Sequence, residues 1–220
     1  MSEKTITKND IIELIRRVSD KIVENRDYLS KLDTEIGDGD HGVGLAAGFK
    51  SFADKLAEFG SADIGGLLKK GGFELIKTVG GASGAIFGTL FTGQALYYDA
   101  NLKGKDSLTL GEFTNMLTEA LCQIKKRGSA QVGEKTMVDA FEPAVAALQD
   151  AVKGGLAFGQ AFKQAAAKAR EGAESTMKMV ATKGRAKNLG ERSLGFIDPG
   201  SMSTTLILES MAEYFAAKNL

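Results

Sequence analysis

The sequence predicts an all-α protein, a bundle of eight helices in a single domain over residues 1–220. Apolar residues recur at steps of three and four through most of the chain, which is the period of an amphipathic helix. Only two prolines, Pro143 and Pro199, interrupt the 220 residues, so long stretches contain no strong helix breaker. No β-branched run alternates with polar residues in the way that predicts a half-buried strand.

The expected helices follow this apolar pattern along the chain. Residues 8–29 have the clearest stripe, from Ile11 to Val23, and residues 109–126 repeat the same spacing. A helix over 136–153 has Pro143 near its start, where a proline suits the first helical turn. The run from Phe87 to Tyr98 is apolar enough for a strand, but its glycines and length favour a tightly packed helix. The full expectation is eight helices at residues 8–29, 42–58, 63–79, 83–101, 109–126, 136–153, 156–179 and 201–217.

The composition is that of an ordinary globular protein and excludes several classes. The 28 basic residues balance 28 acidic ones, so nothing indicates a basic surface for nucleic acid. The single cysteine, Cys122, excludes an internal disulfide and fits a reducing compartment. The N-terminus is polar, and no apolar run approaches the ~20 residues that span a membrane. We therefore expect a cytoplasmic protein with no nucleic-acid or membrane partner.

Short connections between the expected helices predict antiparallel neighbours, as in a helical bundle. Every second connection then lies at the same end. The segments 30–42, 79–83, 127–136 and 180–201 should therefore meet at one pole, and they are the segments richest in glycine and polar residues. Glycines mark turns and places where the backbone must approach a ligand closely. The topology alone therefore predicts a ligand site at this end.

Three aspartates, Asp33, Asp38 and Asp40, lie in one glycine-rich stretch before the second expected helix. Carboxylates this close repel one another unless a cation neutralises them, and oxygen ligands suit a hard divalent ion such as Mg²⁺. The structural alternative is that Asp38 or Asp40 caps the helix that begins near Gly42. An EF-hand is excluded because position twelve counted from Asp38 is Phe49 rather than Glu. The spacing of three acids favours the metal site over the cap.

Two further features have the chemistry of phosphate binding. Residues 80–84, GGASG, precede a helix, so free N–H groups and the Ser83 hydroxyl would form an anion cradle. The structural alternative is a plain interhelical turn. It is not a Walker loop, because G-x-x-x-x-G-K-[ST] occurs nowhere, and no expected strand precedes it as in a Rossmann fold. The only histidine, His41, lies at a helix start, where phosphate contact is better supported than catalysis.

Basic residues near the C-terminal end are further candidates for phosphate binding. Lys183, Arg185 and Arg192 precede the segment 198–200, DPG, and arginine forms forked hydrogen bonds to phosphate oxygens. The structural alternative is a solvated basic loop. Together the residues predict a helical protein that binds a divalent metal and a phosphate-bearing ligand at one end of its bundle. Phosphoryl transfer is the reaction that such parts suit.

These motifs, in this order, resemble the nucleotide-binding L domain of the dihydroxyacetone kinases. The resemblance covers nearly the whole chain and rests on DTEIGDGDHG from Asp33, GGASG from Gly80, KTMVD from Lys135, ATKGR from Ala181, LGERS from Leu189 and DPG from Asp198. It implies a barrel-like bundle of eight antiparallel helices with the nucleotide site at one end. This agrees with the helix count expected from the apolar pattern.

The resemblance also implies the residues of the site. In the family, the aspartates that match Asp33, Asp38 and Asp40 hold two Mg²⁺ ions that bridge the phosphates of ADP or ATP. Phosphate contacts match His41, Gly42, Val43, Gly44, Ala82 and Ser83, and further nucleotide contacts match Gly128, Met137, Arg185, Asp198, Pro199 and Gly200. No catalytic residue is assigned.

Two forms of kinase use this domain. One fuses it to a substrate domain and uses ATP. The other keeps it as a free subunit, in which bound ADP is a coenzyme that is rephosphorylated by a phosphohistidine on an M subunit of the phosphotransferase system. The phosphoryl group then passes to dihydroxyacetone held by a K subunit. We expect the free-subunit form, because the chain ends at Leu220, and its single histidine argues against holding ketose or relaying phosphohistidine itself.

Three alternatives stay open at this stage. The chain could exchange ATP freely beside a separate substrate subunit, or serve a related short-ketose or tetrulose kinase. A nucleotide-sensing regulatory protein is the alternative from another class. A homodimer is compatible with the sequence.

Overall fold

The computed structural model describes residues 4–220, which form ten α-helices, two 3₁₀ helices and one pair of short strands. The elements are β1 (Thr5–Thr7), α1 (Lys8–Glu24), α2 (Arg26–Ile36), α3 (His41–Asp54), α4 (Leu56–Phe59), α5 (Ile64–Val79), α6 (Gly81–Asn101), β2 (Ser107–Thr109), α7 (Leu110–Gly128), α8 (Val138–Lys153), α9 (Phe158–Ser175), η1 (Thr176–Lys178), η2 (Ala186–Ser193) and α10 (Pro199–Ala217).

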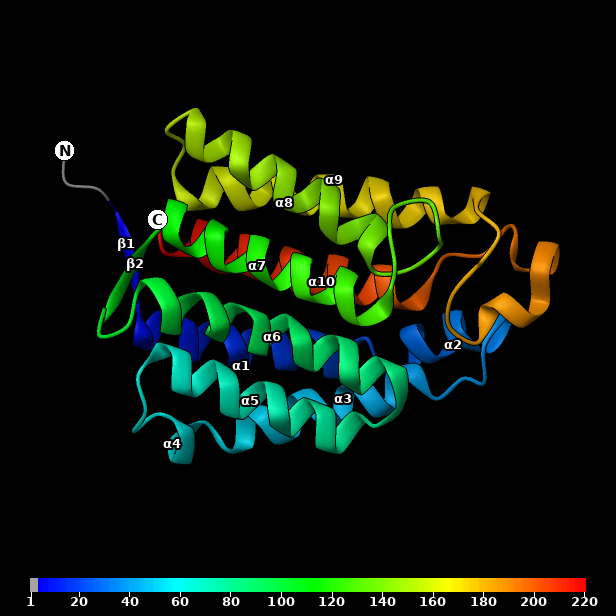
Figure 1. The fold of residues 1–220 in the computed structure, drawn as a ribbon, viewed down its shortest axis with the longest axis horizontal. Coiled ribbons are helices and arrows are strands. Elements are labelled where there is room, and N and C mark those ends of the chain that lie inside the picture. Colours follow the sequence, from blue (N-terminus) through cyan, green and yellow to red (C-terminus); the bar gives the residue numbers. More distant parts are fainter. Residues whose placement is uncertain (1–3) are drawn as a thin grey trace.

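Eight of these helices form a closed ring (Figure 1). In order around the ring, α1 packs on α3, α3 on α5, α5 on α6, α6 on α7, α7 on α8, α8 on α9, α9 on α10, and α10 on α1. Neighbours run antiparallel, so their apolar stripes face one shared core. The predicted bundle of eight antiparallel helices is therefore confirmed. The short helices α2 and α4 are additions to it.

Four connecting segments meet at the right-hand end of the bundle in Figure 1. They are the α2–α3 loop, the α5–α6 turn, the α7–α8 loop and the segment from η1 to the start of α10. These are the connections that the helix order predicts at one end. We call this end the ligand pole, because it holds the predicted site residues.

Several predicted boundaries were wrong, each for a local reason. The helix expected over 8–29 ends at Glu24, and α2 then runs to Ile36 through residues expected to be loop. The helix expected over 42–58 breaks at Lys55, and the one expected over 156–179 passes into 3₁₀ geometry after Ser175. Amphipathic periodicity continues across such breaks, so the pattern cannot locate them.

The sequence pattern also missed a small sheet. Strands β1 and β2 pair antiparallel with Ile6 opposite Leu108, both fully buried. Each strand ends in a threonine that begins the next helix with a capping box, Thr7 with Asp10 and Thr109 with Glu112. Three residues are too few for alternation to be visible. The pair fixes the starts of α1 and α7 side by side at the end opposite the ligand pole.

Pro143 lies well inside α8 rather than in its first turn. Because proline has no N–H, the carbonyl four residues earlier, that of Asp139, loses its helical partner. Helix α9 crosses α8 at this point, and a Cβ on Gly172 would lie 2.1 Å from the Asp139 oxygen. The glycine allows α9 to cover the freed carbonyl.

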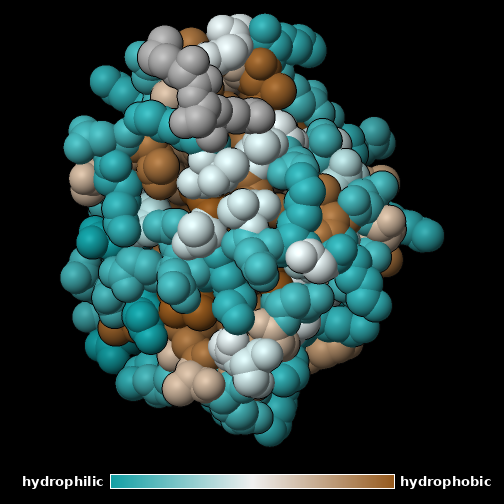
Figure 2. All heavy atoms as spheres, turned by 90° about the vertical axis from the view of Figure 1, so that its left-hand side faces the viewer, coloured by the Kyte–Doolittle hydropathy of each residue, from teal (hydrophilic) through white to brown (hydrophobic). Residues whose placement is uncertain are grey.

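Helix α10 is the most deeply buried element, with buried residues in almost every turn from Pro199 to Phe215. It contacts α1, α8 and α9, and it also reaches α2 at the ligand pole. The opposite end of the bundle, seen in Figure 2, is mostly hydrophilic, with apolar side chains only in small patches. Within residues 4–220, no helix is both long and apolar enough to cross a bilayer.

Helices α5 and α6 pack so closely at Gly72 that a larger side chain at this position should be destabilising. A Cβ on Gly72 would lie 2.7 Å from the Gly88 carbonyl oxygen. We expect Gly72→Ala to lower the free energy of unfolding by about 1–3 kcal/mol, because the helices must separate. The control is Gly111→Ala in α7, whose Cβ would meet Val152 at an ordinary 3.6 Å. It should be neutral or slightly stabilising in urea unfolding, and equal effects of the two variants would contradict the packing argument.

Glu74 should make stability depend on pH. Its carboxylate accepts hydrogen bonds from Lys55 Nζ at 2.6 Å, Ser51 Oγ at 2.7 Å and Thr78 Oγ1 at 3.1 Å. The Lys55 bond is the largest cause that lowers the pKa of Glu74 from 4.5 to about 2. A lowered pKa stabilises the fold above pH 4.5, and this contribution is lost as pH falls towards 2.

The matching variant is Glu74→Gln. Because Lys55 is more than a third exposed, we discount the contribution to about 1–2 kcal/mol at pH 7. Urea unfolding at pH 7 and at pH 3 should show this difference shrinking at the lower pH. Glu171→Gln, which removes an exposed partner of Lys168, is the control and should show no comparable change. A difference for Glu74→Gln that is the same at both pH values would contradict the argument.

Candidate functional site

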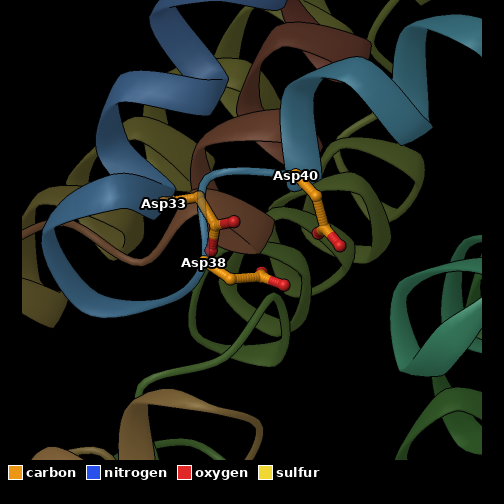
Figure 3. Close-up of side chains that lie close together, drawn as sticks. All are labelled: Asp33, Asp38 and Asp40. Carbon is orange, nitrogen blue, oxygen red and sulfur yellow. The ribbon is translucent and has the colours of Figure 1, made fainter.

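The three predicted metal-ligating aspartates lie together at the ligand pole (Figure 3). Asp33 belongs to the last turns of α2, and Asp38 and Asp40 lie in the loop that leads into α3. One carboxylate oxygen from each lies within 4.8 Å of the others. Asp33 is buried, whereas Asp38 and Asp40 are exposed. One side of the cluster is therefore fixed in the protein and the other faces solvent.

The loop geometry depends on Gly37. A Cβ at this position would lie 2.2 Å from Asp33 Oδ1, so only glycine lets the chain turn directly over the buried carboxylate. The turn returns Asp38 and Asp40 to the side of Asp33 that faces solvent. The acidic cluster is therefore a product of the turn as well as of the sequence spacing.

Helix capping does not explain Asp38 and Asp40. Asp40 is the residue before α3, but its side chain makes no capping hydrogen bond. The backbone N–H of His41 donates instead to Asp33 Oδ2, at 3.2 Å. Asp33 thus satisfies the first amide of α3 from a different helix, and the carboxylates of Asp38 and Asp40 stay available for another partner.

Arg185 neutralises part of this charge. Its guanidinium forms ion pairs with Asp38 and, at 3.6 Å, with Asp40. All three side chains are well exposed, with Arg185 63% exposed. Exposed ion pairs contribute little to stability, about 0–1 kcal/mol, so Arg185 can leave when a stronger cation binds. Three carboxylate oxygens around a shared, solvent-facing space are a donor set that fits a hard divalent cation.

Two helix N-termini face the same pole. Helix α3 begins at His41 and α6 at Gly81, and the first amides of any helix lack an intrahelical acceptor. No side chain caps α6, whose preceding residue, Gly80, has a φ of 69°. The amides of Ala82 and Ser83 are therefore positioned to bind an anion. The amide of Gly44 already donates to the Asp40 carbonyl at 2.9 Å, so a contact of Gly44 with a ligand would not use its N–H.

His41 connects three helices. Its Nδ1 lies 3.3 Å from Ser83 Oγ at the start of α6, and its Nε2 lies 2.8 Å from Ser203 Oγ in α10. The ring is 7% exposed, and burial lowers its pKa, opposed by the charge of Asp33 and the carbonyl of Pro199. Burial therefore favours the neutral imidazole. Sequence reasoning did not find Ser203, although hydroxyl residues are unusually frequent at the start of this buried helix.

The predicted nucleotide contacts at the start of α10 are fixed by Asp198. Its carboxylate accepts from the Ser201 N–H at 2.6 Å and caps the helix, with Pro199 in the first turn. Gly200 packs against Met137, whose backbone nitrogen would be 3.7 Å from a Cβ. Desolvation raises the pKa of Asp198 to about 7, against the effects of the Ser201 amide and of Lys135. A carboxyl group with a pKa near 7 is partly protonated at neutral pH, so Asp198 adds less than a full negative charge to the pole.

Lys135 joins these loops through buried hydrogen bonds, a role that the sequence did not reveal. It is 2% exposed and has a left-handed backbone, with φ of 60°. Its ammonium donates to the carbonyl of Thr176 at 2.6 Å and to that of Phe196. Asp139 accepts from the Thr136 amide at 2.7 Å and holds the same loop. The α7–α8 loop, η1 and the approach to α10 are thereby joined.

The structure thus brings most of the predicted site residues to one pole. Asp33, Asp38 and Asp40 form the acidic cluster with Arg185, while His41 and Ser83 touch each other. Met137 is buried beside Gly200, and Val43 is exposed on the first turn of α3. Gly128, the last residue of α7, lies beside Ile86 of α6 rather than at the acidic cluster. The binding role of each residue stays a prediction.

Comparison with known proteins gives consistent matches. A family model described as the DAK2 domain matches residues 35–213. The *Escherichia coli* (strain K12) protein described as PEP-dependent dihydroxyacetone kinase, ADP-binding subunit DhaL, is 38% identical over 94% of this chain and 97% of its own. The L-erythrulose kinase of *Pectobacterium atrosepticum* is 33% identical over 88% of this chain, but over only 32% of its own length.

Solved structures share the fold. The native dihydroxyacetone kinase of *C. freundii* matches with a TM-score of 0.73 and 25% identity, over 92% of this chain and 34% of the kinase chain. The same kinase in complex with AMP-PNP and Mg²⁺ matches with a TM-score of 0.75 and 23% identity. This chain therefore corresponds to about a third of that kinase. From the family match and the full-length similarity, the chain belongs to the DAK2 domain family.

Proposed function

We propose that this chain is the nucleotide-binding subunit of a dihydroxyacetone kinase, with residues 1–220 forming one nucleotide-binding domain. ADP with Mg²⁺ would stay bound as a coenzyme, be phosphorylated by a phosphohistidine on an M subunit, and pass the phosphoryl group to ketose on a K subunit. The protein would act in the cytoplasm. The observation that carries the proposal is the convergence of three carboxylates, the N-termini of α3 and α6, and Arg185 at one pole.

Sequence similarity supports the subunit form. The *E. coli* ADP-binding subunit is 38% identical and is covered over 97% of its length. The erythrulose kinase is 33% identical, and this chain covers only 32% of its length. Similarity is therefore greater to the relative that is named as a separate ADP-binding subunit.

For the metal site, we propose that Asp33, Asp38 and Asp40 hold two Mg²⁺ ions. The fit rests on three carboxylate oxygens within 4.8 Å and on the weak, exposed ion pairs by which Arg185 holds two of the acids. When bound, Mg²⁺ would neutralise phosphate charge and polarise the transferring phosphoryl group. Arg185, released from the acids, would turn to the phosphates, to which guanidinium binds in a forked geometry.

The phosphates would lie between the N-termini of α3 and α6, where amides of Gly42, Val43, Ala82 and Ser83 are free of intrahelical partners. The remainder of the nucleotide would contact Gly128, Met137 and the segment 198–200. Gly200 has no side chain between Met137 and the pole, so the backbone of α10 is accessible there. These amides hold and orient the anion, and no side chain of this chain is proposed to carry the phosphoryl group.

The need for partner subunits follows from His41. It is the only histidine, it is 7% exposed, and both ring nitrogens already have partners. A phosphohistidine or a covalently held ketose needs an accessible imidazole nitrogen. We therefore propose that both functions come from other proteins.

A rim of exposed apolar side chains at the ligand pole supports docking there. Val132, Met177, Val180 and Leu194 are 38–53% exposed. The segments that carry them are tied together, because Gly195 donates to the Met177 carbonyl at 2.8 Å and Thr182 donates to that of Glu134 at 3.3 Å. We propose that the K and M subunits approach this rim, since the phosphoryl group must leave the protein at this end.

Reconstitution tests the function. The purified chain is dialysed, and one portion is denatured and analysed for nucleotide by mass spectrometry. A second, native portion is mixed with a K subunit, dihydroxyacetone and a large excess of an M subunit that carries phosphohistidine. We expect retained ADP and many molecules of ketose phosphate per ADP without added ATP. Loss of ADP on dialysis with stoichiometric use of ATP would favour a kinase that exchanges ATP. Absence of ketose phosphate under both conditions would favour a nucleotide-sensing protein.

The acidic cluster should determine nucleotide affinity. We expect Asp38→Asn and Asp40→Asn each to weaken binding of Mg·ADP about tenfold or more, because each removes a charged metal ligand. Isothermal titration calorimetry measures this directly. Asp54→Asn, at the other end of α3 and paired only with Lys50 among the described residues, is the matched control. Unchanged affinity in both cluster variants would contradict the assignment.

Arg185→Met should have opposite effects on two ligands. Without nucleotide, loss of the competing guanidinium should tighten Mn²⁺ binding about three- to fivefold, the size expected for exposed ion pairs. Binding of Mg·ADP should weaken, because the phosphates lose a forked donor. Electron paramagnetic resonance of Mn²⁺ and calorimetry measure the two affinities, with Arg16→Met, an exposed arginine of α1 paired with Glu13, as the control. Changes in the same direction for both ligands would show that Arg185 does not alternate between acids and phosphate.

A further inference from the structure

The hydrogen bonds around Ser203 determine where the protons of His41 lie. Ser203 is fully buried in α10, and its hydroxyl donates to the Pro199 carbonyl at 2.9 Å, one turn earlier in the helix. A serine hydroxyl has one hydrogen, so once that hydrogen is donated its oxygen can only accept. His41 Nε2 lies 2.8 Å from the same oxygen, and it is the donor of this contact when the hydroxyl is directed at the carbonyl.

The other ring nitrogen follows from this assignment. A neutral imidazole has one N–H, so if Nε2 holds the hydrogen, Nδ1 has only a lone pair. Nδ1 lies 3.3 Å from Ser83 Oγ, and this contact is a hydrogen bond only if the Ser83 hydroxyl donates. The hydrogen bonds then run in one direction, from Ser83 to His41, from His41 to Ser203, and from Ser203 to the Pro199 carbonyl.

We propose that Ser203 is a positioning residue that holds His41 as its Nε2–H tautomer and thereby fixes the Ser83 side chain at the start of α6. Every hydrogen in this series then has an acceptor. In the opposite tautomer Nε2 could only accept, so the Ser203 hydroxyl would have to turn to it and leave the Pro199 carbonyl, which also contacts the His41 ring, without either hydrogen in a buried site. The series ties the starts of α3, α6 and α10 at the ligand pole.

The arrangement also decides how Ser83 can meet a phosphate, a consequence that rests on the proposed function. Its hydroxyl hydrogen is already directed at His41, so the hydroxyl cannot donate to a second oxygen at the same time. The backbone amides of Ala82 and Ser83 are free at the start of α6. Phosphate would therefore be held at this helix by amides, with the Ser83 side chain turned inward against His41.

The sequence makes the first test unambiguous, because the chain has one histidine. The protein is labelled with ¹⁵N-histidine and its long-range ¹H–¹⁵N spectrum is recorded without nucleotide at pH 8, above the ordinary imidazole pKa of about 6.5. Couplings to the two ring protons identify each nitrogen and show which one is protonated. We expect a protonated Nε2 and an unprotonated Nδ1. A protonated Nδ1, or an averaged mixture of tautomers, would overturn the proposal.

Variants then test whether Ser203 is the cause. Ser203→Ala should shift His41 away from the pure Nε2–H form and weaken binding of Mg·ADP about tenfold, and Ser203→Thr, which keeps the hydroxyl, should restore both. The matched control is Thr205→Val, which removes another fully buried α10 hydroxyl, one that donates only to the Ser201 carbonyl at 3.0 Å. It should change neither the spectrum nor the affinity. An unchanged His41 spectrum in Ser203→Ala would overturn the assigned role.

The spectroscopic and binding results separate this inference from the proposed function. The wild-type spectrum needs no nucleotide and no partner subunit. If the chain binds no Mg·ADP, the proposed function fails while the tautomer assignment stands on its own spectrum. If Mg·ADP binds but Nδ1 is the protonated nitrogen, the positioning role of Ser203 fails and the proposed function is unaffected.

Discussion

Carboxylates that share a small volume repel one another, and the ligand pole holds three of them with oxygens within 4.8 Å. Their repulsion must be balanced by a cation, and the surrounding structure is arranged around this requirement. Gly37 lets the chain turn over the buried Asp33, and Arg185 reaches in from the segment before η2 to pair with the other two acids. Since those pairs are exposed and weak, the site is neutralised without being permanently filled.

The same pole is made rigid by groups that do not face solvent. Lys135 and His41 are both buried, and each joins segments that are distant in sequence. Lys135 joins the α7–α8 loop to η1 and to the approach to α10. Three helix starts and three loops are therefore held in fixed relation while the acids that they surround stay exposed. A pole built in this way can accept a ligand with little rearrangement of its backbone.

Much of this could be predicted from the sequence, for definite reasons. Helical periodicity gave the ring of eight helices, because each helix buries one stripe against the core. The spacing of Asp33, Asp38 and Asp40 in a glycine-rich stretch indicated the acidic cluster, and the turn at Gly37 brings the three carboxylates together. The breaks at Asn25 and Lys55 and the strand pair could not be predicted, because apolar periodicity continues across a kink and three residues show no alternation.

The roles of the buried residues Ser203 and Lys135 could not be predicted from the sequence, because their contacts join segments that are distant in the chain. Ser203 touches His41 from 162 residues away, and Lys135 reaches Phe196 across 61 residues. One sign was nevertheless present: α10 has hydroxyls at Ser201, Ser203, Thr204 and Thr205, all buried in its first two turns. Each of these hydroxyls donates a hydrogen bond to a carbonyl oxygen one turn earlier in the helix, so it can be buried without an unmet hydrogen bond. Ser203 differs from the other three because its oxygen also lies within hydrogen-bond distance of an imidazole nitrogen, that of His41. The same hydroxyl that donates to a carbonyl in its own helix can therefore also orient the histidine.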